Sequence, residues 1–534
     1  MGLNVTGTET LATLLARRAQ STPDHTFLVF EDVSGDVIER TYAEMYRRAV
    51  RAAGTFAGLG ATKSDVVHVH LANCPEFFDC WFGASLLGAV LVPTNPLLTA
   101  DELSFVLGHS QPLLSVTEPS LLEVLLEAEV SKILVARSGG DLVVHDHIQG
   151  FEAAMESADD FADIDVEPTD LAAIMYTSGT TSRPKGVCVT HANYVFVGEV
   201  IAQHLRMQPD DRTMVVLPLF HANAQYYSTM PALVTGASIS VTERFSASSW
   251  SRQVARHGAT LASLFAAPIR MILAQERHSL DDKNRLRGVI FSQNVTEQQL
   301  VEFEGRFGCP LLQLYGMTET IAPPTLNPLY GERRNMSIGR PTLPASVRIV
   351  DEDGRDVPAG EVGELLVAGT AGVTLMAGYL DDPRATEEAL RDGWLHTGDN
   401  VRADENGYLY FVDRGKDMIK RAGENISAGE VEAVINSHPA VFDCAVIGMP
   451  DSMRDEAVKA FVVPMEGAAI SAPELTEWCA RSLARFKVPG AIEFVHSLPR
   501  TSVGKIQKEK LRQRPAPLPR LREGDGRPDA RPSQ

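Results

Sequence analysis

The feature that most constrains the fold of this chain is an alternation of amphipathic helical patterns with short runs of β-branched residues. The stretch YAEMYRRAVRAAGTFAGLG, residues 42–60, places its apolar side chains at helical spacing. The runs VVHVHLA, residues 66–72, and TMVVLPL, residues 213–219, have the composition of strands. Because this rhythm is typical of helices packed against sheets, we predict an α/β fold whose large N-terminal domain consists of helix-flanked sheets.

The pattern changes near residue 337, where short strands separated by glycine replace the helices. We predict a small β-barrel-like subdomain over residues 337–380 from the segments ASVRIVDEDG, GEVGELLVAG and GVTLMAGYL. Helical patterns return at residues 429–437 and 472–485, with strands at DCAVIGMP and EAVKAFVVP between them. We therefore predict an N-terminal domain of residues 1–412, a small α+β domain of residues 413–512, and a disordered tail of residues 513–534 rich in Pro, Gly, Arg and Asp.

Composition excludes several classes of protein. The formal net charge of -20 argues against nucleic acid as the main partner, because phosphate contact needs clustered lysine and arginine. Six cysteines without a CxxC pair indicate reduced, buried thiols in a cytoplasmic protein, and the first residues do not show the pattern of a signal peptide. The uncharged run of residues 80–100 is broken by Pro93, Asn95 and Pro96, so we predict a buried helix leading into a strand and no membrane span.

The stretch YTSGTTSRPKGV, residues 176–187, has the composition of a phosphate-binding loop. It follows an apolar run and combines glycines, a lysine and several hydroxyl groups, which together suit a polyphosphate. It is not a Walker A loop, because Pro184 stands directly before Lys185 and the Gly-Lys-Ser/Thr sequence is absent. A flexible polar turn is the alternative, and the loop alone leaves both interpretations open.

Three later stretches decide between these interpretations. YGMTET, residues 315–320, WLHTGD, residues 394–399, and PRTSVGK, residues 499–505, follow the loop in a characteristic order and spacing. With it they resemble the adenylate-forming superfamily of acyl-CoA synthetases, nonribosomal-peptide adenylation domains and beetle luciferases. The segments DGWLHTGD and FVDRGKDMIKRAGENIS are most similar to the crotonobetaine/carnitine-CoA ligase subgroup. Ser182 stands where glycine is usual in the superfamily, but the subgroup resemblance includes this serine.

This resemblance implies an ATP-dependent acyl-CoA ligase, an acid-thiol ligase that forms acyl-AMP, releases pyrophosphate and transfers the acyl group to CoA. ATP, Mg²⁺ and CoA are the implied cofactor and co-substrates. Thr318 would contact the α-phosphate, and Glu319 would help to hold Mg²⁺. The remaining residues implied to bind ATP or AMP are Thr177, Ser178, Gly179, Thr180, Thr181 and Lys185 for the β- and γ-phosphates, Tyr315 and Gly316 for adenine, and Asp399 and Arg414 for the ribose. Taken alone, Thr318 could equally cap a helix and Asp399 could belong to a turn.

The resemblance also implies that the small domain is mobile. Lys505 would enter the site during adenylation and bridge carboxylate and phosphate oxygens, Lys416 would mark the hinge, and Gly423 would leave room for pantetheine in a CoA tunnel. Without the family context, both lysines could be ordinary exposed charges. Gly423 could equally be a turn residue before a helix.

The segment LPLFHANAQYY, residues 217–227, is expected to form the acyl pocket. His221 matches the aromatic residue that gates this pocket in relatives, although a lone histidine is more often structural. Ala222 and Ala224 leave space, and Asn294 would narrow or polarise one wall. We therefore expect a bulky or partly polar acid, such as a natural-product acid, rather than a straight fatty chain.

Two alternative functions stay open. The enzyme could stop at acyl-AMP and pass the acyl group to a carrier protein or a partner enzyme. In a different class, the protein could be a catalytically dead nucleotide-binding regulator, but the retention of Glu319 and Lys505 argues against this. The sequence does not identify the acid, the thiol acceptor or the oligomeric state, and a homodimer is compatible with the resemblance.

Overall fold

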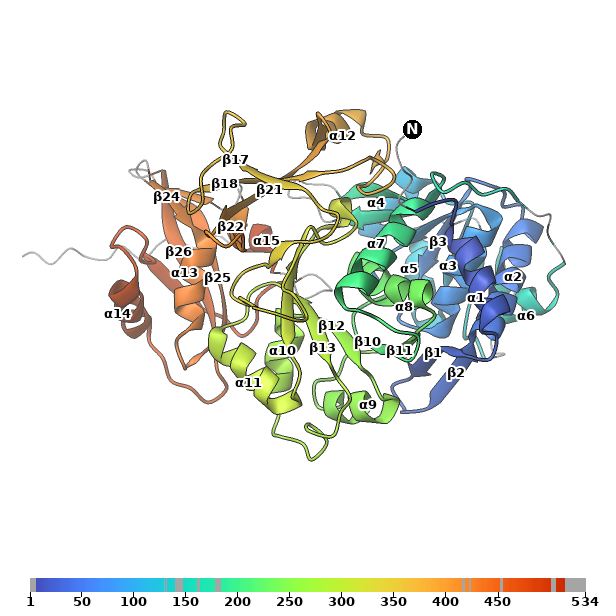
Figure 1. Cartoon of the computed structure of the whole chain (residues 1–534), viewed down its shortest axis with the longest axis horizontal. Helices are drawn as coiled ribbons and strands as arrows, with labels where there is room; N and C mark the ends of the chain where they lie inside the picture. The colour runs from blue at the N-terminus through green and yellow to red at the C-terminus, as the bar shows by residue number, and fades with distance from the viewer. Residues whose placement is uncertain are drawn as a thin grey trace, which may run out of the picture. The chain divides into compact units, whose positions relative to one another are not determined.

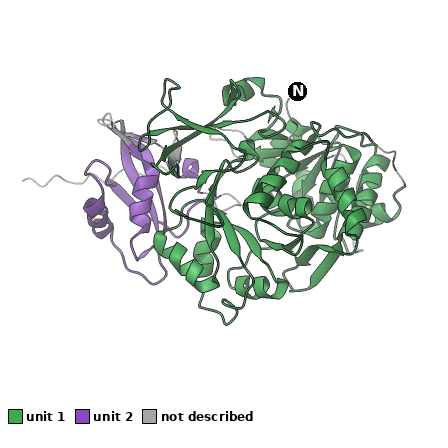
Figure 2. Cartoon of the chain, in the orientation of Figure 1, with its two compact units in different colours: residues 1–412, 502–504 green, residues 413–501, 505–534 purple. Residues whose placement is uncertain are grey.

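The chain divides into two compact units in its computed structural model. The boundary lies between Val412 and Asp413 (Figure 2). The structure describes residues 6–128, 130, 132–139, 147–159, 161, 164–177, 184–414, 418–421, 424–451, 455–500 and 506–513.

The first sheet of the large unit supplies most of the candidate site. Its central strands, from β14 to β1, run parallel, and short antiparallel strands flank them at both edges. In spatial order the described strands are β16 (Arg340–Pro341), β15 (Thr325–Leu326), β14 (Leu311–Tyr315), β13 (Gly288–Ser292), β12 (Leu261–Phe265), β10 (Arg212–Val215), β11 (Ser238–Thr242), β1 (Thr26–Glu31) and β2 (Val37–Thr41).

The second sheet carries both ends of the predicted phosphate loop. Strands β8 and β9 form an antiparallel pair joined by that loop, and the strands beyond β8 are parallel. In spatial order the described strands are β19 (Gly378–Tyr379), β9 (Lys185–Thr190), β8 (Leu171–Thr177), β4 (Val90–Pro93), β3 (Val66–His70), β5 (Leu114–Thr117), β6 (Ile133–Val135) and β7 (Ile148–Gly150).

Helices fill the space between the two sheets. Helix α2 (Tyr42–Gly58) packs on α3 (Pro75–Leu87), and α7 (His191–His204) packs on α8 (Met230–Thr235), so each pair bridges one sheet to the other (Figure 1). Helix α3 is buried all round, as expected of a helix enclosed by apolar layers. The other helices of the large unit are α1 (Leu11–Ser21), α4 (Ala100–Ser110), α5 (Leu122–Glu127), α6 (Phe151–Glu156), α9 (Trp250–His257), α10 (Ala266–Leu273), α11 (Glu297–Phe307) and α12 (Pro383–Ala389), with a π-helical turn at Asn223–Thr229 and 3-10 turns at Pro119–Leu121 and Thr318–Thr320.

The predicted helix and strands of this unit are largely confirmed. The run of residues 80–100 contains the end of α3 followed by β4, as predicted from its proline breaks. All six cysteines are free and buried. In the part of the chain that the structure describes, no helix is both long and apolar enough to cross a membrane.

The β-rich region of the large unit differs in extent from the prediction. Its described strands are β17 (Val347–Val350), β18 (Val362–Ala368), β21 (Trp394–Ala403), β20 (Leu390–Arg391) and β22 (Leu409–Arg414), which form an antiparallel sheet. The region therefore continues well past residue 380. The segment GVTLMAGYL does not join it, because its last strand, β19, pairs with β9 in the second sheet. A strand pattern alone does not specify its partner.

The small unit has its own hydrophobic core, in which α13 packs on β25. The observed helices and strands match the predicted α+β pattern. They are β23 (Met418–Arg421), β24 (Glu424–Ser427), α13 (Ala428–Asn436), β25 (Val441–Asp451), β26 (Asp455–Pro464), α14 (Ala472–Ser482), β27 (Ala491–Phe494) and α15 (Lys508–Arg512). The disordered tail was predicted for residues 513–534, and residues 514–534 lie outside the described residues.

Candidate functional site

The candidate site lies at the carboxyl ends of the parallel strands of the first sheet. Residues expected in the acyl pocket follow β10 and β13, and the YGMTET segment begins at the end of β14. In open α/β sheets, ligands bind at this edge, because loops converge there around the ends of the strands. The sheet therefore brings together residues that are far apart in the sequence.

Tyr315 and Asp399, both predicted to bind the nucleoside, are in direct contact. The Tyr315 hydroxyl donates a hydrogen bond to Asp399 Oδ2 at 2.6 Å. The Asp399 side chain is nearly inaccessible, with the residue 2% exposed, and its amide is held by the Thr397 hydroxyl. The Tyr315 ring also stacks near Phe411, with 6.3 Å between centroids. An aromatic ring and a carboxylate are thus placed side by side.

Glu319 lies on a short 3-10 turn, Thr318–Thr320, directly after β14. Thr318 does not cap this turn, because the capping position is Met317. The amide of Met317 donates a hydrogen bond to the Thr320 hydroxyl. Thr318 itself is half-buried. Glu319 is 6% exposed and accepts a hydrogen bond from the Tyr379 hydroxyl at 3.0 Å.

Gly316 is in close contact with a tyrosine of the π-helical turn. A Cβ atom at this position would collide with the Tyr227 hydroxyl, so only glycine fits without a shift of that ring. The π-helical turn therefore packs directly behind the segment that carries Thr318 and Glu319. Such turns occur frequently at functional sites.

The two ends of the predicted phosphate loop are paired across the β8–β9 hairpin. Thr177 is the last residue of β8 and lies opposite Lys185, the first residue of β9. The Lys185 ammonium lies 4.6 Å from the centroid of the Tyr379 ring. The other predicted phosphate ligands, Ser178, Gly179, Thr180 and Thr181, lie outside the described residues.

Several predicted residues of the small unit and its boundary are not described. Lys416, Gly423 and Lys505 lie outside the described residues, and Arg414 ends β22 with a side chain that is also outside them. The residues that flank the Lys505 segment are anchored within the small unit. Arg500 pairs with Ile506 and forms an ion pair with the buried Asp443.

His221 belongs to the segment from which the acyl pocket is predicted. It follows β10, and its ring packs on Phe220 with 4.1 Å between centroids. Burial lowers the pKa of His221 to about 3, so the imidazole is neutral near pH 7. A neutral imidazole is better suited to the wall of an acyl pocket than to a site that needs a positive charge. Ala222 is half-buried, whereas Ala224 lies in the π-helical turn and is fully buried.

Asn294 follows β13 on an exposed part of the same edge. Its Oδ1 accepts a hydrogen bond from Gln313 Nε2 at 3.3 Å, and its carbonyl contacts Arg270. Gln313 is buried within β14. The Asn294 side chain is therefore oriented by a buried amide while it keeps access to solvent.

Two residues that the sequence analysis did not identify organise this edge. Asn73 donates hydrogen bonds from Nδ2 to the carbonyls of Leu217 and Thr242, and its Oδ1 accepts from the amide of Leu219. It thereby fixes the segment that leads to His221. Tyr379 contacts both Glu319 and Lys185. Neither role has a local sequence signal, because both depend on contacts between residues far apart in the chain.

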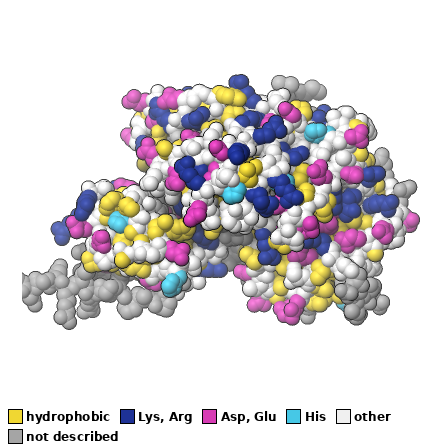
Figure 3. Space-filling view, turned by 90° about the horizontal axis from the view of Figure 1, so that it is seen from below, with side chains coloured by type: hydrophobic (Ala, Val, Ile, Leu, Met, Phe, Trp, Pro, Cys, Tyr) yellow, Lys and Arg dark blue, Asp and Glu magenta, His cyan; other side chains and the backbone are white. Residues whose placement is uncertain are grey.

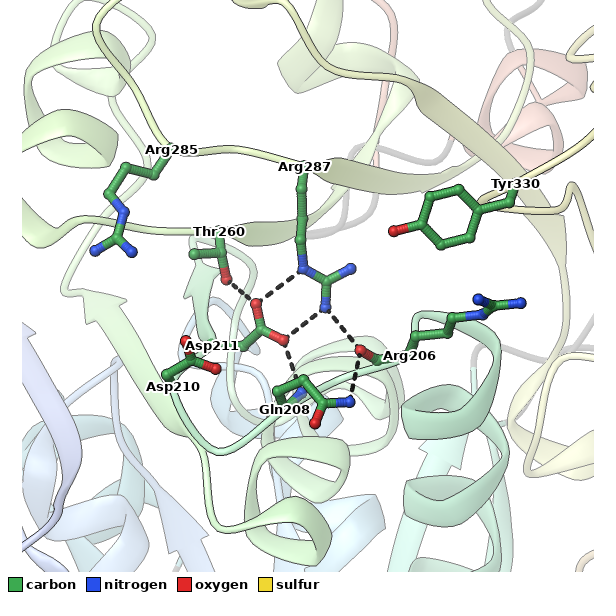
Figure 4. A pocket seen from close by; sticks show the side chains of 8 residues that line it. All are labelled: Arg206, Gln208, Asp210, Asp211, Thr260, Arg285, Arg287 and Tyr330. Atoms are coloured by element: carbon green, nitrogen blue, oxygen red, sulfur yellow. Dashed lines mark hydrogen bonds and ion pairs between the residues drawn. The ribbon is translucent and has the colours of Figure 1, made fainter.

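The opposite edge of the sheet has a surface hollow of about 400 Å³, and two of the residues that line it, Asp211 and Arg287, form an ion pair (Figure 4). Arg287 binds Asp211 through two hydrogen bonds, at 2.9 and 2.6 Å, and also donates to the carbonyl of Leu205. Thr260 donates to the same carboxylate at 2.6 Å. Because Asp211 and Arg287 satisfy each other, we interpret this cluster as a structural connection between the amino ends of β10, β12 and β13.

Charged side chains of both signs are mixed over the face of the protein that Figure 3 shows. The candidate site instead relies on a few oriented groups. Glu319 supplies a carboxylate and Lys185 an ammonium, and both lie against one tyrosine. This arrangement can hold a polyphosphate together with a divalent cation, because it offers a positive charge to the anion and an oxygen ligand to the metal.

Comparison with known proteins identifies the family. The pattern of the AMP-binding enzyme family matches residues 15–380, and that of the AMP-binding enzyme C-terminal domain matches residues 430–505. The crotonobetaine/carnitine–CoA ligase of Salmonella enteritidis PT4 (strain P125109) is 40% identical over 496 residues, which is 92% of this chain and 96% of the relative.

Solved structures show the same fold. ATP-bound MatB from Rhodopseudomonas palustris is 30% identical, with a TM-score of 0.83 over 94% of this chain and 98% of the other. The anthranilate CoA ligase AuaEII in complex with anthranoyl-AMP is 25% identical, with a TM-score of 0.86 over 95% of this chain and 97% of the other. Together with the arrangement of residues at the carboxyl edge of the sheet, these matches show that the chain belongs to the AMP-binding enzyme family.

Proposed function

We propose that this protein is an ATP-dependent acyl-CoA ligase that activates a carboxylic acid as acyl-AMP and transfers the acyl group to CoA. One observation carries the proposal: Lys185, at the end of the phosphate loop, and Glu319, the expected metal ligand, contact the same tyrosine side chain. The relatives named as CoA ligases support the same activity.

The first half-reaction forms the acyl-adenylate. A carboxylate oxygen of the acid attacks the α-phosphorus of ATP, the bond to the bridging oxygen of the β-phosphate breaks, and pyrophosphate leaves. Two anions must approach each other, so the site has to suppress their repulsion. Lys185 would bind the outer phosphates, Thr318 the α-phosphate, and Lys505 would bridge the reacting oxygens.

The carboxylate of Glu319 has the chemistry of a magnesium ligand. In the described part of the chain no group of three or more His, Cys, Asp or Glu side chains could hold a metal, and Mg²⁺ is commonly bound by one or two carboxylates together with substrate phosphates. Bound there, the ion would neutralise negative charge on the phosphates. Tyr315 and Asp399 would hold adenine and ribose, with Arg414 as a second ribose contact.

The second half-reaction forms the thioester. The sulfur of CoA, after losing its proton to solvent, attacks the carbonyl carbon of acyl-AMP, and AMP leaves. In our proposal the small domain turns about Lys416 between the two steps, so that Lys505 withdraws and Gly423 borders the path of pantetheine. The same domain would then serve both reactions.

We infer that the acid is bulky or partly polar. His221 is held neutral by burial and could pack against an acyl group, while Asn294 keeps an amide near the edge of the sheet. A long unbranched chain would leave the amide of Asn294 unused.

Product analysis by mass spectrometry tests this proposal. The protein is incubated with ATP, Mg²⁺, CoA and a panel of linear, aromatic, betaine-type and terpenoid acids, with controls that lack ATP or CoA. We expect an acyl-CoA and AMP for at least one bulky or polar acid, and the loss of both in Lys505→Ala.

Other products would contradict the proposal in distinct ways. Acyl-AMP without thioester would mean that a carrier protein or partner enzyme accepts the acyl group. ATP binding without any adenylate, for every acid tested, would identify a nucleotide-binding regulator instead.

A further inference from the structure

Tyr379 lies on a segment that is attached on both sides to the candidate site. The amide of Met376 donates to the carbonyl of Glu319 at 3.0 Å, and the amide of Leu380 donates to the carbonyl of Gly186 at 2.8 Å. Strand β19 also pairs with β9, with Tyr379 opposite Val187. The five residues 376–380 therefore link the turn that carries Glu319 to the strand that carries Lys185.

The side chain of Tyr379 contacts both charged groups with different parts. Its hydroxyl donates to Glu319 Oε1 at 3.0 Å, and the Lys185 ammonium lies 4.6 Å from its ring centroid. The face of an aromatic ring attracts a cation, and this attraction is stronger where water is partly excluded.

We propose that Tyr379 is a positioning residue that holds Glu319 and Lys185 at the spacing needed to bind ATP together with its divalent cation. This inference rests on the proposed function. The hydroxyl restricts the rotation of the Glu319 carboxylate toward the metal, and the ring restricts the Lys185 ammonium next to the phosphate loop. The two effects belong to separate parts of one side chain, so separate substitutions can remove them.

The chain contains a chemically matched tyrosine elsewhere in the large unit. The Tyr410 hydroxyl donates to Asp404 Oδ2 at 3.3 Å, and the Arg402 guanidinium lies 4.6 Å from its ring centroid. Neither Asp404 nor Arg402 belongs to the proposed catalytic or binding machinery. Substitution of Tyr410 therefore measures what the loss of such contacts costs outside the site.

The test compares Tyr379→Phe and Tyr379→Leu with Tyr410→Phe and Tyr410→Leu. Adenylate formation is followed by pyrophosphate exchange while Mg²⁺ and ATP are varied separately, and thermal unfolding is recorded for each variant. Tyr379→Phe should raise the Mg²⁺ concentration needed for half-maximal rate by roughly fivefold, as expected for the loss of one hydrogen bond to a charged group, with little change in the KM for ATP. Tyr379→Leu should also raise the KM for ATP about threefold, because the cation–π contact is lost.

The Tyr410 variants should keep the Mg²⁺ and ATP dependence of the unsubstituted protein. Unchanged Mg²⁺ dependence in Tyr379→Phe would overturn the positioning role, as would an equal change in Tyr410→Phe. The phenylalanine variant keeps the ring and decides the question even if the leucine variant does not fold. Failure of the proposed function is distinguishable, because the unsubstituted protein would then form either no adenylate or an adenylate without thioester.

Discussion

The two ends of the same parallel strands differ in how their charged groups are satisfied. At the amino ends of β10, β12 and β13, Asp211 binds Arg287 and Thr260, and the carboxylate is used within the protein. At the carboxyl ends, Glu319 accepts a hydrogen bond from the uncharged Tyr379 hydroxyl, and the ammonium of Lys185 lies against the ring of the same tyrosine.

This difference has a thermodynamic consequence. A carboxylate that binds a guanidinium at two points contributes to stability and has little attraction left for a ligand. A hydrogen bond from a neutral donor, such as the one Glu319 accepts from Tyr379, does not neutralise the charge of the carboxylate. We therefore expect substitutions at the carboxyl edge to change activity and substitutions at the amino edge to change stability.

The largest expected effect is at the carboxyl edge. Glu319→Gln should lower adenylate formation about a thousandfold, in the upper range found when an electrostatic contact to the transition state is removed. The free energy of unfolding should stay almost constant, because the amide can still accept from Tyr379. Pyrophosphate exchange and urea unfolding measure the two quantities.

Glu302→Gln is the matched control for that substitution. It removes the same charge from an exposed position of α11 and should leave both rate and stability unchanged. A comparable loss of rate in both variants would show that net charge, rather than the position of Glu319, controls the reaction.

The second-largest effect is a loss of stability, expected for a substitution at the amino ends of the parallel strands. Arg287→Met should lower the free energy of unfolding by roughly 2 kcal/mol, because Asp211 loses its charged partner while it stays mostly buried. Activity per folded molecule should stay within about twofold of the original, since a substitution outside the site removes no contact to the transition state. Loss of activity in protein that is still folded would contradict the structural role assigned to this cluster.

A smaller effect is expected for Asn294. Asn294→Gly removes the amide that Gln313 orients, and should change the ratio of kcat/KM between a bulky and a small acid roughly fivefold. Total stability should change little, because the residue is exposed. The competition is measured with both acids in one reaction, and an unchanged ratio would remove Asn294 from the acyl pocket.

The smallest expected effect is on how much stability the protein loses at acidic pH, and it depends on Asp211. Burial by itself raises the pKa of Asp211, but hydrogen bonds from Arg287, Thr260 and the Gln208 amide outweigh burial and hold it below its usual value. The ionised form therefore contributes stability above the pKa of the unfolded chain, and this contribution is lost as the pH falls through the lower pKa of the folded protein.

Asp211→Asn tests this contribution. The variant should be less stable than the original at pH 7 and should lose less stability as the pH falls toward 3. Urea unfolding at several pH values gives the slope of the free energy of unfolding against pH for the variant and for the original protein. Parallel slopes would mean that other carboxylates, such as Glu31, whose pKa is lowered to about 2, account for the acid sensitivity.

Much of the fold could be predicted from local patterns. The helical spacing of residues 42–60 and the strand patterns at residues 66–72 and 443–450 correspond to α2, β3 and β25. The proline breaks after residue 92 identified a strand end rather than a membrane span. These features depend on neighbours in the sequence, so a single segment contains the information.

Pairing partners could not be predicted in the same way. The segment GVTLMAGYL has a strand pattern, but it pairs with β9, nearly two hundred positions earlier, instead of with the adjacent strands. In the same way, Asp211 and Arg287 are 76 positions apart and meet only because β10, β12 and β13 are aligned in register.

The sequence by itself determined the α/β class, the order of the motifs and the residue types suited to phosphate and metal chemistry. It also separated the small domain from the large one by a change of pattern. Only the tertiary structure decided that Tyr379 contacts both Glu319 and Lys185, that Asn73 fixes the segment before His221, and which charges are neutralised within the protein. The physical reason is that a residue type sets which contacts are possible, whereas burial and strand register determine which contacts are made.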